Sequence, residues 1–259
     1  MKQDERIPVD QALRRARLSA YTPGEFVDQE SFMLAGEILS LAARAGIAPG
    51  VSVLDLCCGV AGPGRLITAE LSCTYFGVDS SASAIEIARE RAADLPCRFD
   101  VSSIPPVPAG PFDVVLLLET MLAFPDKETL LREISSALSV GGRFAFTLEE
   151  GQPLTAAEEG NMPDADTVWL IPLSDMLSCL ERVGLHVRWQ EECSRSHRVM
   201  VDSLICALAA EQSDIAAHLG RRAVDELLAA HLLWSDWLRT GRVRKFAVVA
   251  EKTRTPSGC

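Results

Sequence analysis

The sequence predicts an α/β fold: a doubly wound, mostly parallel sheet of seven strands with helices on both faces, an N-terminal helical lid and a helical insertion before the last strand. Three observations predict it. From Val51 onward, short β-rich runs alternate with segments of helical periodicity. One run, Val114 to Leu118, is apolar without alternation, which is typical of a strand covered on both faces. A glycine-rich turn joins the first strand to the next helix.

Residues 1–50 are expected to form the lid. Two stretches of helical spacing are separated by Thr22-Pro23-Gly24, where proline and glycine favour a break. The second stretch has apolar residues at helical period, among them Phe32, Ile38 and Leu41.

Residues 51–195 are expected to form the cofactor-binding core. The strands of the sheet are predicted at Val51 to Leu56, Tyr75 to Val78, Arg98 to Val101, Phe112 to Leu118, Arg143 to Leu148, Leu185 to Trp189 and Arg244 to Ala250. Between them, Pro63 suits a first helical turn, and Ser80 and Ser81 offer N-caps. Residues Asp126 to Val140 are expected to form a helix that Gly141-Gly142 ends.

The last part of the chain is expected to contain a cap. After an irregular stretch beyond Glu150, a helix over Asp175 to Val183 precedes the sixth strand. Residues 196–243 then form a helical insertion, and residues 244–259 supply the last strand and a tail.

Composition favours a protein that acts on small molecules. The net charge of −11 opposes a polyphosphate backbone, so no nucleic-acid partner is expected. No apolar run reaches the ~20 residues of a membrane span, and Met1 to Asp10 is too polar for a signal peptide. We therefore expect no membrane partner and a cytoplasmic location. The eight cysteines form no Cys-x-x-Cys pairs and no residues have metal-ligand spacing, so neither a disulfide framework nor a metal is expected.

The glycine-rich turn is expected to bind a nucleotide-like cofactor. Gly59, Gly62 and Gly64 allow close approach of a ligand or a positive φ. Asp55, at the end of the first strand, can accept hydrogen bonds from the ligand or brace the loop. Asp79 follows the second strand, where a carboxylate can bind two vicinal ribose hydroxyls.

Dinucleotide-binding folds share this arrangement, but the details disfavour a dehydrogenase. The spacing is Gly-x-x-Gly-x-Gly rather than Gly-x-Gly-x-x-Gly, and Pro63 removes an amide that could bind pyrophosphate. The two tyrosines, Tyr21 and Tyr75, have no lysine four residues later.

Four segments resemble, in order, the motifs of small-molecule class I S-adenosylmethionine-dependent methyltransferases. They are Val-Leu-Asp-Leu-Cys-Cys-Gly-Val-Ala-Gly-Pro-Gly, then Gly77-Val78-Asp79-Ser80-Ser81, then Phe112-Asp113-Val114-Val115, and finally Leu138 to Phe146. The resemblance covers about residues 51–150. It implies a Rossmann-like fold and S-adenosylmethionine as the cofactor, with S-adenosylhomocysteine as the product.

The resemblance also implies roles for individual residues. The methionine moiety would lie against Asp55, Cys57, Cys58, Gly59 and Gly62, and the ribose against Asp79. The adenine edge would lie against Ser80, Asp100, Val101 and Ser102. Glu119 and Thr120 would lie near the sulfonium, and Tyr21 and Gln29 of the lid would also contact the cofactor. One departure is Cys57, which stands where the family often has a glycine. A reactive Cys57-Cys58 pair is the alternative to small side chains packed in the loop.

A catalytic base is optional, because the methyl group already carries a good leaving group and the protein mainly aligns the acceptor and excludes water. For an oxygen or carbon acceptor, the candidate bases are Glu119, Glu150 and His197, with Glu149 and His186 also considered. The two adjacent glutamates could equally be a solvated strand end, and His197 an exposed loop histidine.

The predicted function is methyl transfer from S-adenosylmethionine to a small-molecule acceptor by a monomer or homodimer. The alternative is a protein that binds the cofactor without transferring the methyl group, as a cyclase or structural partner would. A nucleic-acid methyltransferase is disfavoured, because Leu118 to Met121 replaces an Asn/Asp-Pro-Pro-Tyr/Phe motif.

Overall fold

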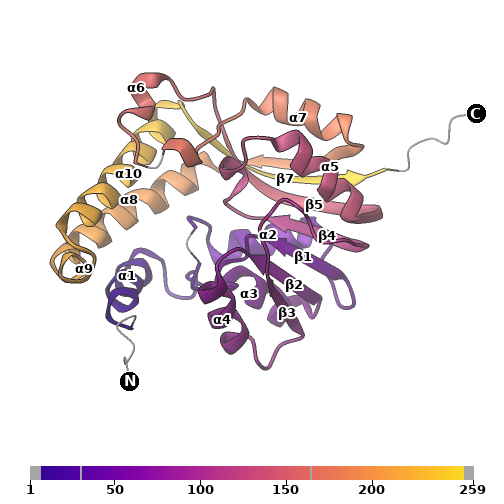
Figure 1. Ribbon diagram of the computed structural model, residues 1–259, viewed down its shortest axis with the longest axis horizontal. Coiled ribbons are helices and arrows are strands. Elements are labelled where there is room, and N and C mark those ends of the chain that lie inside the picture. Colours follow the sequence, from indigo (N-terminus) through magenta and orange to yellow (C-terminus); the bar gives the residue numbers. More distant parts are fainter. Residues whose placement is uncertain (1–6, 30, 164, 254–259) are drawn as a thin grey trace, which may run out of the picture.

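The computed structural model describes residues 7–29, 31–163 and 165–253 (Figure 1). The helices are α1 (Ile7–Ala20), α2 (Ala35–Arg44), α3 (Gly62–Leu71), α4 (Ala82–Arg91), α5 (Lys127–Ala137), α6 (Ala156–Glu159), α7 (Leu173–Arg182), α8 (Ser194–Ala210), α9 (Gln212–Leu219) and α10 (Arg221–Thr240), with the 3₁₀ turns η1 (Met121–Ala123) and η2 (Ala165–Thr167). The strands are β1 (Ser52–Leu56), β2 (Thr74–Asp79), β3 (Cys97–Val101), β4 (Phe112–Leu117), β5 (Leu138–Glu150), β6 (Leu185–Glu192) and β7 (Arg244–Lys252).

These seven strands form one sheet in the order β3-β2-β1-β4-β5-β7-β6. The first five strands of that order are parallel, and β7 runs antiparallel to both of its neighbours. The predicted seven-stranded, mostly parallel sheet is therefore confirmed. The direction of strand order reverses between β1 and β4. In open α/β sheets, ligands bind in the crevice beyond the carboxyl ends of the strands at such a point.

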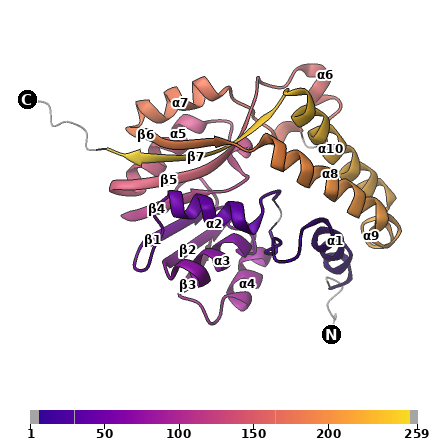
Figure 2. The same cartoon turned by 180° about the vertical axis from the view of Figure 1, so that it is seen from behind.

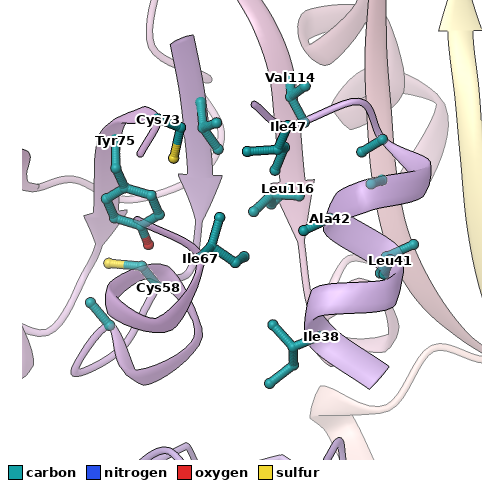
Figure 3. Packing of buried hydrophobic residues seen from close by; sticks show 14 of the residues in the cluster. Ile38, Leu41, Ala42, Ile47, Cys58, Ile67, Cys73, Tyr75, Val114 and Leu116 are labelled. Atoms are coloured by element: carbon teal, nitrogen blue, oxygen red, sulfur yellow. The ribbon is translucent and has the colours of Figure 1, made fainter. Parts of the chain in front are cut away.

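Helices cover both faces of the sheet, and each face has its own apolar core. On one face, Ile38, Leu41 and Ala42 of α2 are buried in the same cluster as Val114 and Leu116 of β4 (Figure 3). Burial of an aliphatic side chain of this size contributes about 1.5–3 kcal/mol. α3 and α4 share this face, while α5 and α7 cover the other. The sheet is thus the rigid frame on which the loops at its carboxyl edge rest.

A helical cap extends from one end of the sheet. Helices α8 to α10 lie between β6 and β7 in the sequence and project away from the strands, with α1 packed beside them (Figures 1 and 2). Ala12 and Ala16 of α1 contact Leu208, Ile215 and Val224 in a small separate core. Alanine at these positions lets the helices approach closely. None of the helices in the described ranges has the length and apolarity that crossing a bilayer requires.

The fourth core helix ends earlier than the sequence predicts. Asp126 caps it by accepting from the amide of Thr129, and the helix stops at Ala137 instead of the predicted Val140. The chain enters β5 at Leu138, because this residue already pairs with Phe112 of β4. The glycine pair after it therefore lies within a strand and does not end the helix.

Candidate active site

The turn between β1 and α3 is a tight loop at the carboxyl edge of the sheet. Cys57, Gly59 and Ala61 all adopt left-handed φ values, of +58°, +53° and +57°. The amide of Cys58 donates to the carbonyl of Val78 at the end of β2, so the loop is tied to the neighbouring strand. A Cβ placed on Gly59 would meet nothing within 4 Å. Open space beside this glycine is what a loop that carries a ligand needs.

Asp79 holds the edge of the loop. Its carboxylate accepts hydrogen bonds from the amide of Gly59 at 2.9 Å and from that of Ser81 at 2.8 Å. The amide of Ser102, just after β3, donates to the carbonyl of Asp79 at 2.8 Å. The side chains predicted for the adenosine end, those of Ser80, Asp100, Val101 and Ser102, therefore lie at the ends of β2 and β3 next to Asp79. Asp79 is fixed in place and half-buried, as binding of vicinal hydroxyls requires.

Asp55 supports the loop from below instead of lining it. Its side chain is only 3% exposed and accepts a hydrogen bond from the hydroxyl of Tyr75 at 2.5 Å. The pKa of Asp55 is raised to about 7, mainly by burial. The hydrogen bond from Tyr75 partly offsets this rise, and the nearby charge of Asp79 adds to it. Gly64 permits this arrangement, because a Cβ there would lie 2.1 Å from the Tyr75 ring. Of the two roles considered for Asp55, bracing the loop is the one its contacts provide.

The segment between α1 and α2 lies directly on the glycine loop. A Cβ on Gly62 would come within 1.9 Å of the carbonyl oxygen of Val27, so this glycine accommodates the segment. Gln29, predicted as a ligand contact, is buried; its amide oxygen accepts from Val27 at 2.7 Å and its amide nitrogen donates to Met33 at 2.6 Å. The Tyr21 hydroxyl likewise donates within the segment, to the carbonyl of Ser31. Both side chains shape the segment that covers the loop.

Glu119, which follows β4, adopts a left-handed φ of +61° and meets the cap. Its amide donates to the Thr147 hydroxyl at 2.6 Å, and its Oε2 lies 3.0 Å from Nε2 of His197 in the first turn of α8. A non-glycine residue in this conformation persists only where its surroundings hold it, and such residues concentrate at functional sites. The hydroxyl of Thr120, beside Glu119, donates to the carbonyl of Leu118 at 3.2 Å. Glu119 and His197, predicted separately, are thus brought together.

A buried lysine that the sequence analysis missed completes this cluster. Lys245 of β7 is 1% exposed; its Nζ lies 2.5 Å from Oε1 of Glu119 and forms an ion pair with Glu149. Burial opposes ionisation of Glu119, but Lys245 and His197 outweigh it and hold its pKa well below the usual range. Burial likewise disfavours the charged form of Lys245, and Glu119 and Glu149 together raise its pKa.

Glu150, the third predicted catalytic residue, does not join the cluster. Successive residues of a strand point to opposite faces, so Glu149 reaches Lys245 while Glu150 pairs with Arg244 at 2.8 Å. Parity alone shows that the two glutamates face opposite sides, with Glu150 on the side of Phe146 and Leu148 and Glu149 on the side of Thr147.

A cleft of about 780 Å³ opens between α2, the end of β6 and α8. His197 lines this cleft as well as contacting Glu119, and Leu34, Leu41, Trp189 and Met200 supply apolar walls. The ring of His197 is 3% exposed, and its Nδ1 has no hydrogen-bond partner among the described residues. No group of three or more metal-ligating side chains occurs in the described ranges.

Comparisons with known proteins agree with this geometry. Residues 47–172 match a family model described as a methyltransferase domain. The methyltransferase GfsG of Streptomyces halstedii is 32% identical over 120 residues, which cover 43% of this chain and 43% of that protein, so the match spans less than half of the curated relative.

Two solved structures share the fold at low sequence identity. The [4+2]-cyclase SpnF aligns over 96% of this chain and 94% of its own with a TM-score of 0.74 and 20% identity. Phosphoethanolamine N-methyltransferase 2 of Haemonchus contortus, in complex with phosphomonomethylethanolamine and S-adenosylhomocysteine, aligns over 95% of this chain and 58% of its own with a TM-score of 0.78 and 18% identity. The match over residues 47–172 agrees with the resemblance of the sequence motifs to class I S-adenosylmethionine-dependent methyltransferases, and the solved structures share the fold.

Proposed function

We propose that the chain transfers the methyl group of S-adenosylmethionine to a small-molecule acceptor. The observation that supports it most directly is the Asp79 carboxylate, which is held at the rim of the glycine loop by the amides of Gly59 and Ser81. A fixed, half-buried carboxylate beside an open loop suits the two hydroxyls of a ribose.

In this proposal the cofactor is held by residues at the ends of three strands. Asp79 takes the ribose, Ser80 and Asp100 to Ser102 border the base, and Cys57 to Gly59 approach the methionine moiety with their backbone. When bound, S-adenosylmethionine supplies a methyl group on a positively charged sulfur. Val27 and Asp28 lie on the loop at Gly62 and keep water from it, which favours the displacement.

The acceptor in this proposal enters through the cleft between α2, β6 and α8. His197 lines that cleft and contacts Glu119, which follows β4 at the edge of the sheet that also carries the glycine loop. Apolar walls favour an acceptor with a hydrocarbon body, and His197 provides a polar contact. The net charge of −11 argues against a polyanionic acceptor. A cytoplasmic monomer or homodimer stays our prediction.

Ligand-dependent stability tests the cofactor assignment. S-adenosylhomocysteine at ~100 times its Kd should add about 2.7 kcal/mol to the unfolding free energy, visible as a rise in Tm. Asp79→Ala should abolish the rise, because the ribose loses its partner, whereas the exposed Asp94→Ala should keep it. No rise for the native chain, or an equal rise in Asp79→Ala, contradicts the proposal. Release of S-adenosylhomocysteine with labelled methyl in a product then tests the transfer.

The second candidate is a reaction that uses the cofactor without consuming it. The match to the [4+2]-cyclase SpnF over nearly the whole chain is the observation that favours it. Methyl-labelled S-adenosylmethionine separates the two: label that stays on the cofactor while a substrate rearranges supports a cyclase, and label in the product excludes it.

A further inference from the structure

Lys245 fixes both partners of the Glu119–His197 contact. Its backbone carbonyl accepts from the amide of Cys193 at 2.8 Å, and its amide donates to the hydroxyl of Ser194 at 2.9 Å, so it anchors the start of α8. Its ammonium meets Glu119 at 2.5 Å. One residue of β7 therefore sets the position of the helix that carries His197 and of the carboxylate that faces it.

The ammonium of Lys245 also offsets the negative charges of the buried carboxylates beside it. A buried ammonium costs several kcal/mol unless it is paired, and Lys245 is paired on one side with Glu149, its register partner on β5, and on the other with Glu119. With a neutral imidazole the cluster has two negative charges and one positive charge. Removal of the ammonium would leave both carboxylates buried without their cation.

The contact with Glu119 determines which ring nitrogen of His197 is basic. Glu119 is ionised beside Lys245 and accepts from Nε2, so the neutral ring keeps its hydrogen there and has a lone pair on Nδ1. We propose that Lys245, itself held in place by Glu149, is a positioning residue that keeps Glu119 ionised against Nε2 of His197, so that Nδ1 of His197 takes a proton from the acceptor. This inference rests on the proposed methyl transfer.

The proposal identifies the class of acceptor. An acceptor whose attacking atom carries an ionisable proton, such as a hydroxyl, gives that proton to Nδ1, and its freed electron pair forms the bond to the methyl carbon. The old carbon–sulfur pair stays on sulfur, and the proton later leaves His197 for solvent. A thioether or a tertiary amine has no such proton and would gain nothing from this arrangement.

Other ionisable groups surround His197 and stay unchanged in the test. Glu37 of α2 lines the same cleft. Tyr21 lies near Glu119, and burial followed by the charge of Glu119 raises its pKa. His231 of α10 packs on Phe32, which also packs on His197, and burial lowers the pKa of His231. The variants below differ only in the charges of Lys245 and Glu149.

The test follows the imidazole of His197 by NMR in the full chain. In the wild type, the nitrogen shifts of the neutral ring should place its hydrogen on Nε2. In Lys245→Met, Glu119 loses the ammonium that keeps it ionised, so burial favours the protonated carboxyl and Nε2 loses its ionised acceptor. The preference for hydrogen on Nε2 should then be lost, whereas Glu149→Gln, which leaves Lys245 beside Glu119, should keep it. Arg244→Met, on the same strand but paired with Glu150, should change nothing.

A ring hydrogen that stays on Nε2 in Lys245→Met overturns the proposal, as does a wild-type ring whose nitrogen shifts place the hydrogen on Nδ1. If Lys245→Met fails to fold, Lys245→Gln, which keeps a polar group beside the two carboxylates, tests the same point. Binding of S-adenosylhomocysteine, measured by the rise in Tm, is followed in the wild type. Its absence there would contradict the proposed function, whereas the position of the ring hydrogen addresses the positioning residue alone.

Discussion

Replacement of Asp55 by asparagine should remove a large part of the pH dependence of stability. Asp55 lies beneath the glycine loop, where burial raises its pKa from 3.8 to about 7 although Tyr75 donates a hydrogen bond to it. The folded protein therefore keeps a proton on this side chain at pH values where the unfolded chain has released it. Stability from the protonated carboxyl is full below pH ~4 and is lost as the pH rises through about 7.

The size of the effect follows from the two pKa values. With 3.8 in the unfolded chain and about 7 in the folded protein, the unfolding free energy falls by about 3 kcal/mol between pH 5 and pH 8. Asp55→Asn cannot ionise, and its carbonyl oxygen can still accept from Tyr75. All other groups titrate alike in both proteins, so the free energy of the variant minus that of the wild type should rise by the same amount.

Urea unfolding followed by tryptophan fluorescence from pH 5 to pH 8 measures this difference. Tyr75→Phe is the matched control, because it removes a hydrogen bond that lowers the pKa of Asp55 and should move the decline to higher pH. A difference between Asp55→Asn and the wild type that stays constant over the range would refute the reasoning.

Two further predictions concern the same loop. Gly62→Ala should lower the unfolding free energy by about 1–3 kcal/mol in urea titrations, because its Cβ would lie 1.9 Å from the carbonyl oxygen of Val27. It should also speed proteolysis of the segment that covers the loop, and an unchanged digestion pattern would argue against that contact. Cys57→Val should cost about 1–2 kcal/mol by calorimetry, because a β-branched side chain is strained at a φ of +58°, whereas Cys57→Gly should cost less; equal Tm values would contradict this.

The sequence predicts the core of the fold well, because its signals are local. Apolar runs place all seven strands within a few residues, and the turn after β1 identifies the cofactor loop. The prediction of where α5 ends was wrong. Leu138 pairs with Phe112, a contact between distant segments, and this pairing ends the helix before the glycines that were expected to end it. The lid residues Tyr21 and Gln29 were found as parts of the cover, but their hydrogen bonds to nearby backbone could not be foreseen from spacing.

The cluster of Glu119, His197, Lys245 and Glu149 shows which contacts the sequence does not predict. Glu119 and His197 are far apart in the chain, and only the insertion of α8 beside β7 brings them within 3.0 Å. Lys245 falls on a polar position of the alternating pattern in its strand, so the sequence suggests that it faces solvent. In the structure both faces of β7 are covered, and Lys245 is buried. Parity puts Glu149 and Glu150 on opposite faces of β5, but both faces are covered, so the sequence does not show which glutamate meets the lysine.

The position of β7 has a consequence for how the protein is made. It lies between β5 and β6, yet of the described strands it is the last to leave the ribosome. Until it arrives, β5 and β6 each present an unpaired edge, and such edges invite pairing with other chains. We expect nascent chains that end before Arg244 to be prone to aggregation, and the closing of the sheet to coincide with delivery of Lys245 to its two carboxylates.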